Sequence, residues 1–584
     1  MSKAGKEILV KAVAQAIPTY AMSCFDLTKG LCDELSTIIG RYWWSQQDKV
    51  NKIHWLSWEK LTRSKKMGGL GFRDLHLFNM AMLARQAWRL LTSPDTLCGQ
   101  VLKAKYFPNT TILQCTAREG ISYSWRSILQ GLHLLKQGLI WRIGNGNNTN
   151  IWADPWIPRG CIRKPITPRG SSLLTKVSEL IDPSTGDWDE QLVTDTFWPE
   201  DASVILTIPI DVDMVDWPAW HFDPMGKFSV KSAYKLAIQI RDQNLGRDAS
   251  SSTAASSNAE CNWHKIWQLK FPNKVNMFIW RLAHNSLPVR RNLARRGVKT
   301  ETVCPVCYRL DEDCGHLFFK CKMAKECWRM MNLEHIRAEL EQCRSGKETV
   351  MRILSFEQKD QNRVFIWLWR WWSARNKANV GERMATAAEI SNSVSFHMME
   401  FEKMANRCIT KPNIPAPKWK PPPVDHYKIN VDASFFESTR AGGWGFVVRD
   451  CDGNFLEGGA RNFPRVANAL QAETLAVKYS LQRVADLEMT KIVLETDASI
   501  VGRPLISTNF DRSPNRCLFR QIHELMMSQF AFCSVSVCAR SCNKVADSLA
   551  SYGCTLEKGS CMYMNYAPDF VLALVSGDLP RASE

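Results

Sequence analysis

The chain has 584 residues, of which 75 are Lys or Arg and 58 are Asp or Glu, so its net charge is +17 at pH 7. At about 100–200 residues per domain, this length predicts three to five domains. Hydrophobic residues make up 45% and charged residues 23%, which excludes a largely disordered chain. The positive surplus favours nucleic acid as a partner, although charge alone would equally fit a basic soluble protein.

No stretch approaches the ~18 uninterrupted apolar residues of a membrane-spanning helix, so we expect no membrane partner. Lys11 and Gln15 interrupt the N-terminal apolar run and Pro18 ends it, which is not typical of a signal peptide. We therefore expect the 20 cysteines to be reduced thiols or metal ligands. An intracellular protein is expected, with the nucleus as a candidate location, although no dense basic cluster provides an import signal.

The N-terminal residues 1–100 have the apolar periodicity of helices, with an amphipathic stretch at 4–18. Gly68, Gly69 and Gly71 predict a turn before a helix. No Gly-Lys-Ser/Thr follows them, so a turn is favoured over a phosphate-binding loop.

Tryptophan is unusually frequent, with 23 residues. One group lies at 141–158 (WRIGNGNNTNIWADPWIP), in a region that connects the N-terminal helices to the rest. A second group, at 362–380, has helical spacing. We interpret the latter as a packing helix between domains, with base stacking on its tryptophans as the alternative.

Cys304 and Cys307 form a C-x2-C pair, and His316 and Cys321 follow it in CPVCYRLDEDCGHLFFKC. A C-x2-C pair can bind from one tight turn, and a His and Cys four residues apart can complete a tetrahedron. The pattern therefore predicts one structural Zn²⁺. The alternative is four ordinary side chains, three thiols and a surface histidine, but the second pair, His316 and Cys321, makes this less favoured. Cys314, which lies between the two pairs, is a competing ligand.

Two composition breaks predict linkers, a Ser/Ala-rich one at 241–262 and a stiff Pro-rich one at 411–423. From Val424 onwards there are 16 basic and 18 acidic residues, a net charge of −2. The first 423 residues therefore have a net charge of +19. We expect the first part to contact phosphates, and an acidic balance in the last part would suit a cation site.

The C-terminal region has the pattern of a mixed α/β sheet. Strands are predicted at 428–437, 442–450, 454–460 and 491–498, and helices at 467–485 and 542–553. Asp452-Gly453 predicts a hairpin turn between the second and third strands. One more strand and helix fit between 498 and 542, which gives a five-stranded sheet with flanking helices.

Four acids lie at informative places in this region. Asp432 is inside the first strand, Glu473 is on the apolar face of the first helix, Asp497 ends an apolar strand and Asp547 is on the last helix. A carboxylate on a core-facing position is costly unless it is paired or binds metal. Their joint placement favours a site for Mg²⁺ or Mn²⁺. Four unrelated, solvated acids are the alternative, and spacing alone does not decide between the two.

The motifs around these acids, NVDAS, QAETLA, LETDA and NKVADSLA, occur in an order that resembles type 1 ribonuclease H, in its plant ribonuclease H-like form. The resemblance covers residues 425–560. It implies a ribonuclease H fold that hydrolyses the RNA strand of RNA–DNA hybrids with two metal ions. It also implies that Asp432, Glu473, Asp497 and Asp547 are the catalytic metal ligands.

One departure from the family concerns a histidine. Family members often have one shortly before the last Asp, whereas this chain has Val537 at the aligned position. The resemblance therefore implies reduced turnover. Arg540 remains nearby, where it could contact phosphate or simply be solvated.

Further motifs resemble the zinc-binding domain that follows the polymerase in plant non-LTR, LINE-type retrotransposons. GKFSVKSAY, KIW…FPNKV, the LP turn and the CPVC–HLFFKC pair occur in the order of that family. Residues 1–100 resemble the thumb end of the same polymerase. The polymerase's catalytic Asp-Asp pair is absent from the chain, so we expect no reverse transcriptase activity.

We therefore expect a multidomain protein, mainly α in its N-terminal and zinc-binding regions and α/β at its C-terminus. The expected segments are a thumb remnant (1–100), a Trp-rich connecting region (101–218), a zinc-binding domain (219–335), a helical connector (336–410), a Pro-rich linker (411–423), a ribonuclease H-like domain (424–560) and a tail (561–584). The favoured function is metal-dependent cleavage of hybrid RNA. A non-catalytic nucleic-acid-binding protein and a decayed retroelement fragment are the alternatives.

Overall fold

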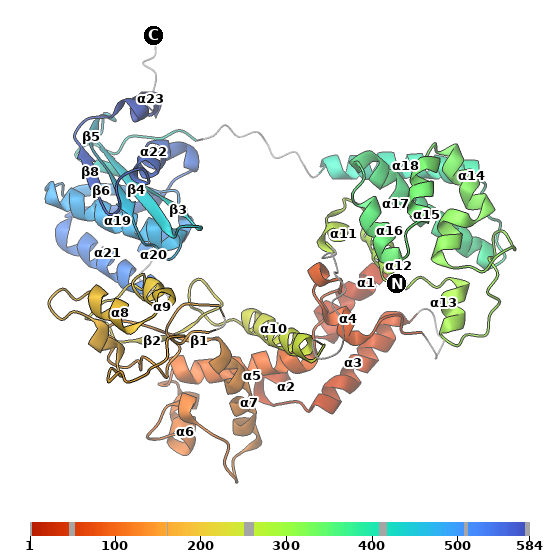
Figure 1. Ribbon diagram of the computed structural model, residues 1–584, viewed down its shortest axis with the longest axis horizontal. Coiled ribbons are helices and arrows are strands. Elements are labelled where there is room, and N and C mark those ends of the chain that lie inside the picture. Colours follow the sequence, from red (N-terminus) through yellow and green to blue (C-terminus); the bar gives the residue numbers. More distant parts are fainter. Residues whose placement is uncertain are drawn as a thin grey trace. The chain divides into compact units, whose positions relative to one another are not determined.

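The computed structural model describes residues 3–45, 53–160, 162–249, 262–407, 417–506 and 512–578. Within the predicted Ser/Ala-rich linker (241–262), residues 241–249 are helical instead, and residues 250–261 lie outside this range. Residues 411–416 of the Pro-rich linker also lie outside it. The chain forms two compact units that do not follow its order (Figure 1). Unit 1 contains residues 1–86, 117–131 and 237–412, and unit 2 contains residues 87–116, 132–236 and 413–584.

Unit 1 is helical in the part of the chain that the structure describes. Its elements, some of which continue into unit 2, are α1 (Lys3–Leu9), η1 (Val10–Ala14), α2 (Thr19–Cys24), α3 (Lys29–Trp44), α4 (Trp58–Thr62), η2 (Lys65–Met67), α5 (Leu75–Thr92), α7 (Tyr123–Gly138), α10 (Val230–Ala249), α11 (His264–Gln268), α12 (Asn273–Ala283), α13 (Arg290–Arg295), η5 (His316–Lys320), α14 (Lys322–Met330), α15 (Glu334–Glu341), α16 (Gly346–Ile353), α17 (Gln358–Asn379) and α18 (Ala387–Arg407).

The core of unit 1 joins the N-terminal helices to the zinc-binding segment. Gly68 has a φ of +83°, and a Cβ there would lie 2.7 Å from the ring of Trp263, so this turn needs glycine. The indole of Trp280 donates a hydrogen bond to the carbonyl of Gly68 (2.8 Å). Trp367 and Trp371 on α17 are buried in the same core, in agreement with a packing helix. The Gly-rich segment is therefore a packed turn.

Unit 2 contains the sheet. Its further elements are α6 (Leu97–Tyr106), η3 (Ile112–Gln114), β1 (Leu139–Arg142), η4 (Val177–Leu180), α8 (Glu190–Thr196), α9 (Pro199–Ile205), β2 (Trp217–Trp220), β3 (Tyr427–Phe436), β4 (Ala441–Arg449), β5 (Phe455–Phe463), α19 (Ala469–Asp486), β6 (Lys491–Thr496), α20 (Ser499–Ile506), α21 (Arg516–Gln529), β7 (Phe532–Val537), η6 (Arg540–Cys542), α22 (Lys544–Gly553), β8 (Cys561–Met564) and α23 (Asp569–Asp578).

The C-terminal sheet has the strand order β7-β6-β3-β4-β5-β8. The strands β3, β4, β5 and β8 pair antiparallel, whereas β6 pairs parallel with β3 and with β7. The predicted mixed α/β fold is thereby confirmed, with one strand more than the five expected. Residues 561–584, which were expected to be a tail, instead contribute β8 and α23; a strand of four residues leaves too short a pattern to detect in sequence.

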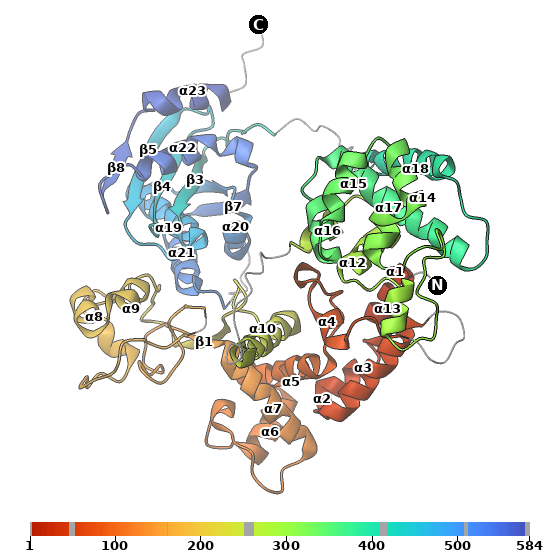
Figure 2. The same cartoon turned by 45° about the vertical axis from the view of Figure 1, so that its right-hand side comes forward.

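Helices cover both faces of this sheet (Figures 1 and 2). Phe446 and Val448 of β4 pack in a core with α19, α20 and α21, whereas Val447 packs with α22 and α23. Successive strand residues point to opposite faces, so this alternation is expected. A Cβ on Gly445 would lie 2.3 Å from the backbone nitrogen of Ala550 in α22. A Cβ on Gly443 would lie 2.7 Å from the carbonyl oxygen of the same residue. These two glycines let the helix that carries Asp547 approach the sheet.

The connecting region packs against the C-terminal domain inside unit 2. Gln471 of α19 donates a hydrogen bond to the carbonyl of Thr207 (2.7 Å), and the thiol of Cys517 donates to the carbonyl of Ile143 (3.5 Å). The strands β1 and β2 pair antiparallel although η4, α8 and α9 lie between them in the chain. Just before β2, the carboxylate of Asp216 accepts hydrogen bonds from the backbone amides of Gly144, Gly146 and Asn148. The segment after β1 thus wraps around one buried carboxylate. Among the described residues, no helix has the length and apolarity needed to cross a membrane.

Candidate metal sites

Four elements carry the predicted carboxylates to one end of the sheet. Asp432 lies in the middle of β3 opposite Gly445, and Asp497 directly follows β6, whose last residue pairs with Val431. Glu473 is on α19 and Asp547 is on α22, helices on opposite faces of the sheet. The parallel pairing of β3 and β6 explains why the acid inside one strand meets the acid that follows the other.

The structure brings three of these acids into one group. One carboxylate oxygen from each of Asp432, Glu473 and Asp497 lies within 4.8 Å of the others. Asp432 is only 7% exposed, and a buried oxygen of Glu473 has no hydrogen-bond partner. Asp547 is exposed and forms a hydrogen bond with Asp432, so it lies at the rim of the group.

The three carboxylates lie close together, and burial and mutual repulsion raise the pKa values of Asp432 and Glu473. Burial, and then the charge of Glu473, raise the pKa of Asp432 to about 9. Burial, and then the charge of Asp497, raise the pKa of Glu473 to about 8, although a hydrogen bond from the backbone of Ala433 opposes the shift. Like charges this close cannot all be ionised without a cation. Hard oxygen donors in this number fit a divalent metal such as Mg²⁺ or Mn²⁺.

A network of buried asparagine amides holds the backbone next to the three carboxylates. Asn543 donates to the carbonyl of Val431 (3.0 Å), and Asn430 donates to the side chain of Asn543 (3.3 Å). Asn430 also donates to Glu495 (3.1 Å). These asparagines were not among the site residues predicted from the sequence. The signal was available, because Asn430 precedes Asp432 by two residues and so shares its face of β3.

The basic residue nearest the carboxylates is loosely held. Arg540 lies 3.5 Å from Asp497, and its side chain is 93% exposed. Val537, where family members often have histidine, ends β7 and is 41% exposed. An exposed pair of this kind gives little stability in water. The arginine is therefore free to exchange the carboxylate for another anion.

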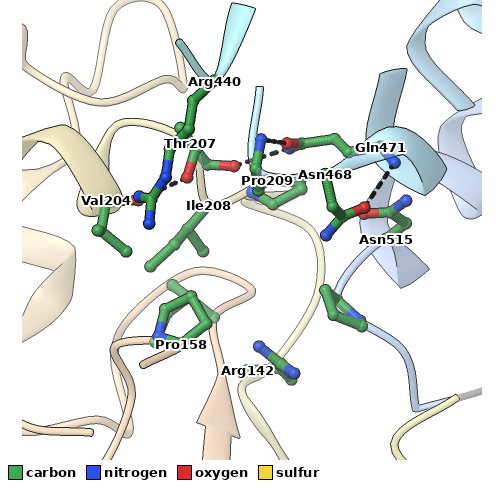
Figure 3. Close-up of a pocket in the computed structure, with 13 residues that line it drawn as sticks. Arg142, Pro158, Val204, Thr207, Ile208, Pro209, Arg440, Asn468, Gln471 and Asn515 are labelled. Atoms are coloured by element: carbon green, nitrogen blue, oxygen red, sulfur yellow. Dashed lines mark hydrogen bonds between the residues drawn. The ribbon is translucent and has the colours of Figure 1, made fainter. Parts of the chain in front are cut away.

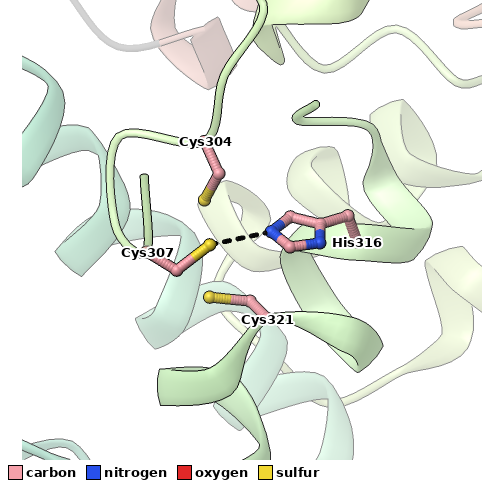
Figure 4. A group of neighbouring side chains, drawn as sticks. All are labelled: Cys304, Cys307, His316 and Cys321. Atoms are coloured by element: carbon pink, nitrogen blue, oxygen red, sulfur yellow. Dashed lines mark hydrogen bonds between the residues drawn. The ribbon is translucent and has the colours of Figure 1, made fainter. Parts of the chain in front are cut away.

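The predicted zinc ligands also come together, in unit 1 (Figure 4). One ligand atom from each of Cys304, Cys307, His316 and Cys321 lies within 4.8 Å of the others, and the sulfur of Cys307 is 3.2 Å from Nε2 of His316. A hydrogen bond to Cys321, and then burial, raise the pKa of Cys304 to about 12. Two thiols sharing a proton in this way fit a site whose protons a metal would displace.

Two nearby side chains lie outside this group. The sulfur of Cys314, the competing ligand considered from the sequence, contacts Oδ1 of Asn285 (3.7 Å), so it is not a fifth ligand in the structure. His284 stacks on Trp263 and forms a hydrogen bond with the carbonyl of Gly68, so it packs against the Gly-rich turn.

A cavity of about 120 Å³ lies between the connecting region and the C-terminal domain in unit 2 (Figure 3). Arg142 and Thr207 line one side, and Asn468 and Asn515 line the other. Burial lowers the pKa of Arg142 to about 10, and its Nε has no hydrogen-bond partner. None of the four carboxylates lines this cavity, so it is separate from the candidate cation site.

Comparison with protein families gives two matches that coincide with these sites. Residues 228–328 match a family described as zinc-binding in reverse transcriptase, and residues 430–553 match one described as reverse transcriptase-like. The first range contains all four Cys and His ligands, and the second contains all four carboxylates.

Solved structures of ribonuclease H resemble part of the chain. Ribonuclease H1 from Halobacterium salinarum is 25% identical and covers 22% of this chain and 96% of its own, with a TM-score of 0.21. LC11-RNase H1 in complex with an RNA/DNA hybrid is 18% identical and covers 22% and 94%, with a TM-score of 0.21.

Two plant relatives match the sequence. An uncharacterized mitochondrial protein of Arabidopsis thaliana is 46% identical over 143 residues, which is 24% of this chain and 93% of the relative. The Arabidopsis thaliana protein At1g65750, provisionally named a ribonuclease H protein, is 26% identical over 606 residues, covering 99% of this chain and 93% of the relative. The chain belongs to the plant retroelement-derived proteins that join a reverse-transcriptase zinc-binding domain to a ribonuclease H-like domain.

Proposed function

We propose that the C-terminal domain hydrolyses the RNA strand of RNA–DNA hybrids in a reaction that depends on Mg²⁺ or Mn²⁺. The observation that carries this proposal is the group formed by Asp432, Glu473 and Asp497, with Asp547 at its rim. Folding places these carboxylates against one another at an electrostatic cost, which divalent cations would remove. A purely structural core would gain stability by replacing them.

The four carboxylates would hold two metal ions, which when bound supply an activated water and neutralise the charge of the leaving oxygen. Asp432 is the central ligand in this proposal, because it is the most buried of the four and extends from the middle of β3. The bond from Asn543 to the carbonyl of Val431 holds the neighbouring backbone in place. Asp547, exposed at the rim, is accessible to substrate and solvent.

The sequence after β7 suggests a slow enzyme. Without a histidine near position 537, the domain has no imidazole there to transfer a proton at neutral pH. Arg540 can contact a phosphate of the substrate, because its present partner Asp497 holds it only at the surface. We expect Arg540→Ala to raise KM for hybrid by roughly fivefold with little change in kcat.

Affinity for the nucleic acid would come mainly from unit 1. This unit contains 44 Lys or Arg and 26 Asp or Glu, a net charge of +18, whereas unit 2 has a net charge of −1. Phosphate contacts by Lys and Arg release counterions and dominate non-specific affinity. The division of charge therefore separates binding from the proposed chemistry.

We infer that the Cys and His group in unit 1 binds one structural Zn²⁺. Three sulfurs and one imidazole nitrogen lie together, and four such ligands would complete a tetrahedral zinc site with no position for a water ligand. The ion would stabilise the loop at 304–321, and it has no part in the proposed hydrolysis.

The test is cleavage of a labelled RNA–DNA hybrid by the full-length protein in Mg²⁺ and in Mn²⁺. Asp497→Asn should lower the cleavage rate by a factor of at least about 10³, because it removes a carboxylate ligand. Asp569→Asn, a change of the same kind at an exposed position on α23, should leave the rate unchanged. Absence of cleavage by the wild-type protein in both metals would contradict the proposal.

The second candidate is a non-catalytic protein that binds nucleic acid through the same fold. The absent histidine and the charge of unit 1 favour it. Retained, salt-sensitive binding of hybrid without cleavage would support this candidate. Loss of both binding and cleavage would instead indicate a decayed retroelement fragment.

A further inference from the structure

A groove of about 610 Å³ opens in unit 1, whereas the four carboxylates belong to unit 2. Its walls are α11 with the loop after it, the end of α16 with the start of α17, and the C-terminal part of α18. These helices lie together in the green and turquoise part of Figure 1. We refer to it as the amide groove, defined by Lys265, Lys270, Phe271, Phe356, Gln361 and Phe401.

The floor of the amide groove is aromatic. Phe271 and Phe401 are 9% and 5% exposed, and their ring centres are 5.9 Å apart. Phe356, at the start of the α17 wall, is half-buried, so part of its ring remains accessible. Such a floor can receive a flat, apolar ring face but provides no partner for a charged group.

One polar side chain in the groove is buried with an open hydrogen-bonding position. Gln361 is 7% exposed, and its Oε1 accepts a bond from Gln358 (3.3 Å). Within the described residues, its Nε2 donates no hydrogen bond to the protein, so this amide can donate to an acceptor on a ligand in the groove. Asn362 and Gln358 add further amides beside it.

The rim of the groove is basic. Lys265 and Lys270 are exposed, and neither has a carboxylate within ion-pair distance among the residues that the structure describes. Glu402 is the acid that lines the groove. The rim therefore has a net charge of +1, within a unit of net charge +18. This charge favours an anionic occupant, and the aromatic floor favours one that also presents a flat ring.

We propose that the amide groove binds single-stranded nucleic acid. An unstacked base packs on the phenylalanine floor and meets the free amide of Gln361, and Lys265 and Lys270 contact the flanking phosphates. Bases of a duplex are stacked and paired, so they cannot enter, whereas single strands present both ring faces and hydrogen-bonding edges. The proposal does not depend on hydrolysis, because the groove and the carboxylates belong to different units.

The first experiment measures binding of fluorescent single-stranded RNA, single-stranded DNA and the matching hybrid to the full-length protein. Lys265→Glu with Lys270→Glu should weaken single-strand binding by at least tenfold. It should also make the dependence of log K on log salt shallower by about 1.4, the value for two lost phosphate contacts. Lys29→Glu with Lys299→Glu is the matched control, because both lysines are exposed, lie in unit 1 outside the groove and give the same charge change.

The second experiment separates base contact from charge. Phe356→Ala should weaken single-strand binding by about tenfold, the loss of one stacked base, without changing the salt dependence. A strand that contains 4-thiouridine should crosslink to peptides around Phe356 or Phe271. An Asp497→Asn background keeps any hydrolysis from affecting the readout.

Four results would each overturn the proposal. An equal loss of affinity in the groove and control pairs would show that only overall charge matters. Crosslinking confined to peptides outside the groove would place the strand elsewhere. Groove variants that bind single strands as well as the wild type would leave the groove to a peptide partner. A larger loss for hybrid than for single strands would assign the groove to duplex instead.

Discussion

The guanidinium of Arg449 lies 3.5 Å from the ring centre of Trp419, so the end of the Pro-rich segment packs on the C-terminal sheet. Both side chains donate to the same oxygen of Asn430, each at 2.9 Å. Asn430 in turn contacts Asn543, which holds the backbone beside Asp432. The segment expected to be only a spacer therefore contributes to the support of the candidate metal site.

Trp419→Ala should destabilise the C-terminal domain by about 3–5 kcal/mol, because it removes a buried indole and leaves the guanidinium of Arg449 partly unsupported. Trp419 is 4% exposed, whereas Trp198 in the same unit is 51% exposed. Trp198→Ala is thus the control, with an expected loss below about 1 kcal/mol. Urea unfolding followed by circular dichroism measures both, and equal effects would contradict a role for Trp419 in the domain.

Zinc binding should distinguish two neighbouring cysteines. Cys304→Ser should lose the metal, because it removes one of four ligands, whereas Cys314→Ser should retain it, because Cys314 lies outside the ligand group. Metal analysis of the purified proteins should find about one Zn²⁺ per chain in the wild type and in Cys314→Ser. Retention of zinc by Cys304→Ser would show that the ligand set is different.

The pH dependence of stability should report the carboxylate group. The pKa values of Asp432 and Glu473 are raised to about 9 and about 8, whereas unfolded carboxyls titrate near pH 4. Without divalent cations, the folded domain holds protons that the unfolded chain releases. Its free energy of unfolding therefore falls as pH rises from about 4 to 9.

Asp432→Asn removes much of this effect. In EDTA at pH 8, it should raise the Tm of the domain by roughly 5 °C, and near pH 4 it should have little effect. At pH 8, Mg²⁺ should make the Tm of the wild type higher than that of Asp432→Asn, because the cation stabilises the complete set of carboxylates in the wild type. Asp569→Asn is the matched control, and an equal change of Tm in that variant would contradict the assignment.

Gln471→Ala should loosen the connecting region from the C-terminal domain. Gln471 is 5% exposed, donates to Thr207 and accepts from the backbone of Ala467, both at 2.7 Å. Its loss leaves the carbonyl of Thr207 and the amide of Ala467 unpaired, and each should lower the free energy of unfolding by about 1–3 kcal/mol. Hydrogen exchange should accelerate at residues 199–210 and 467–472. Gln529→Ala, at an exposed position on α21, should leave this exchange unchanged.

Local sequence patterns predicted which side chains would lie together at the two candidate metal sites. The spacing of Cys304, Cys307, His316 and Cys321 predicted one group of ligands, and the structure brings them together. Four acids were predicted as a second group; their spacing left this open, and the resemblance to ribonuclease H favoured it. The structure groups Asp432, Glu473 and Asp497, with Asp547 at the rim. Strand, helix and hairpin patterns likewise predicted the mixed sheet.

Long-range contacts decided what the local patterns could not. Sequence placed the basic surplus in the first 423 residues, whereas the structure locates it in unit 1, because the connecting region packs with the C-terminal domain. The strand β8, the support of Asn430 by Trp419 and the exclusion of Cys314 depend on residues far apart in the chain. Periodicity reports which face of an element is buried, but only tertiary packing determines what that face is buried against.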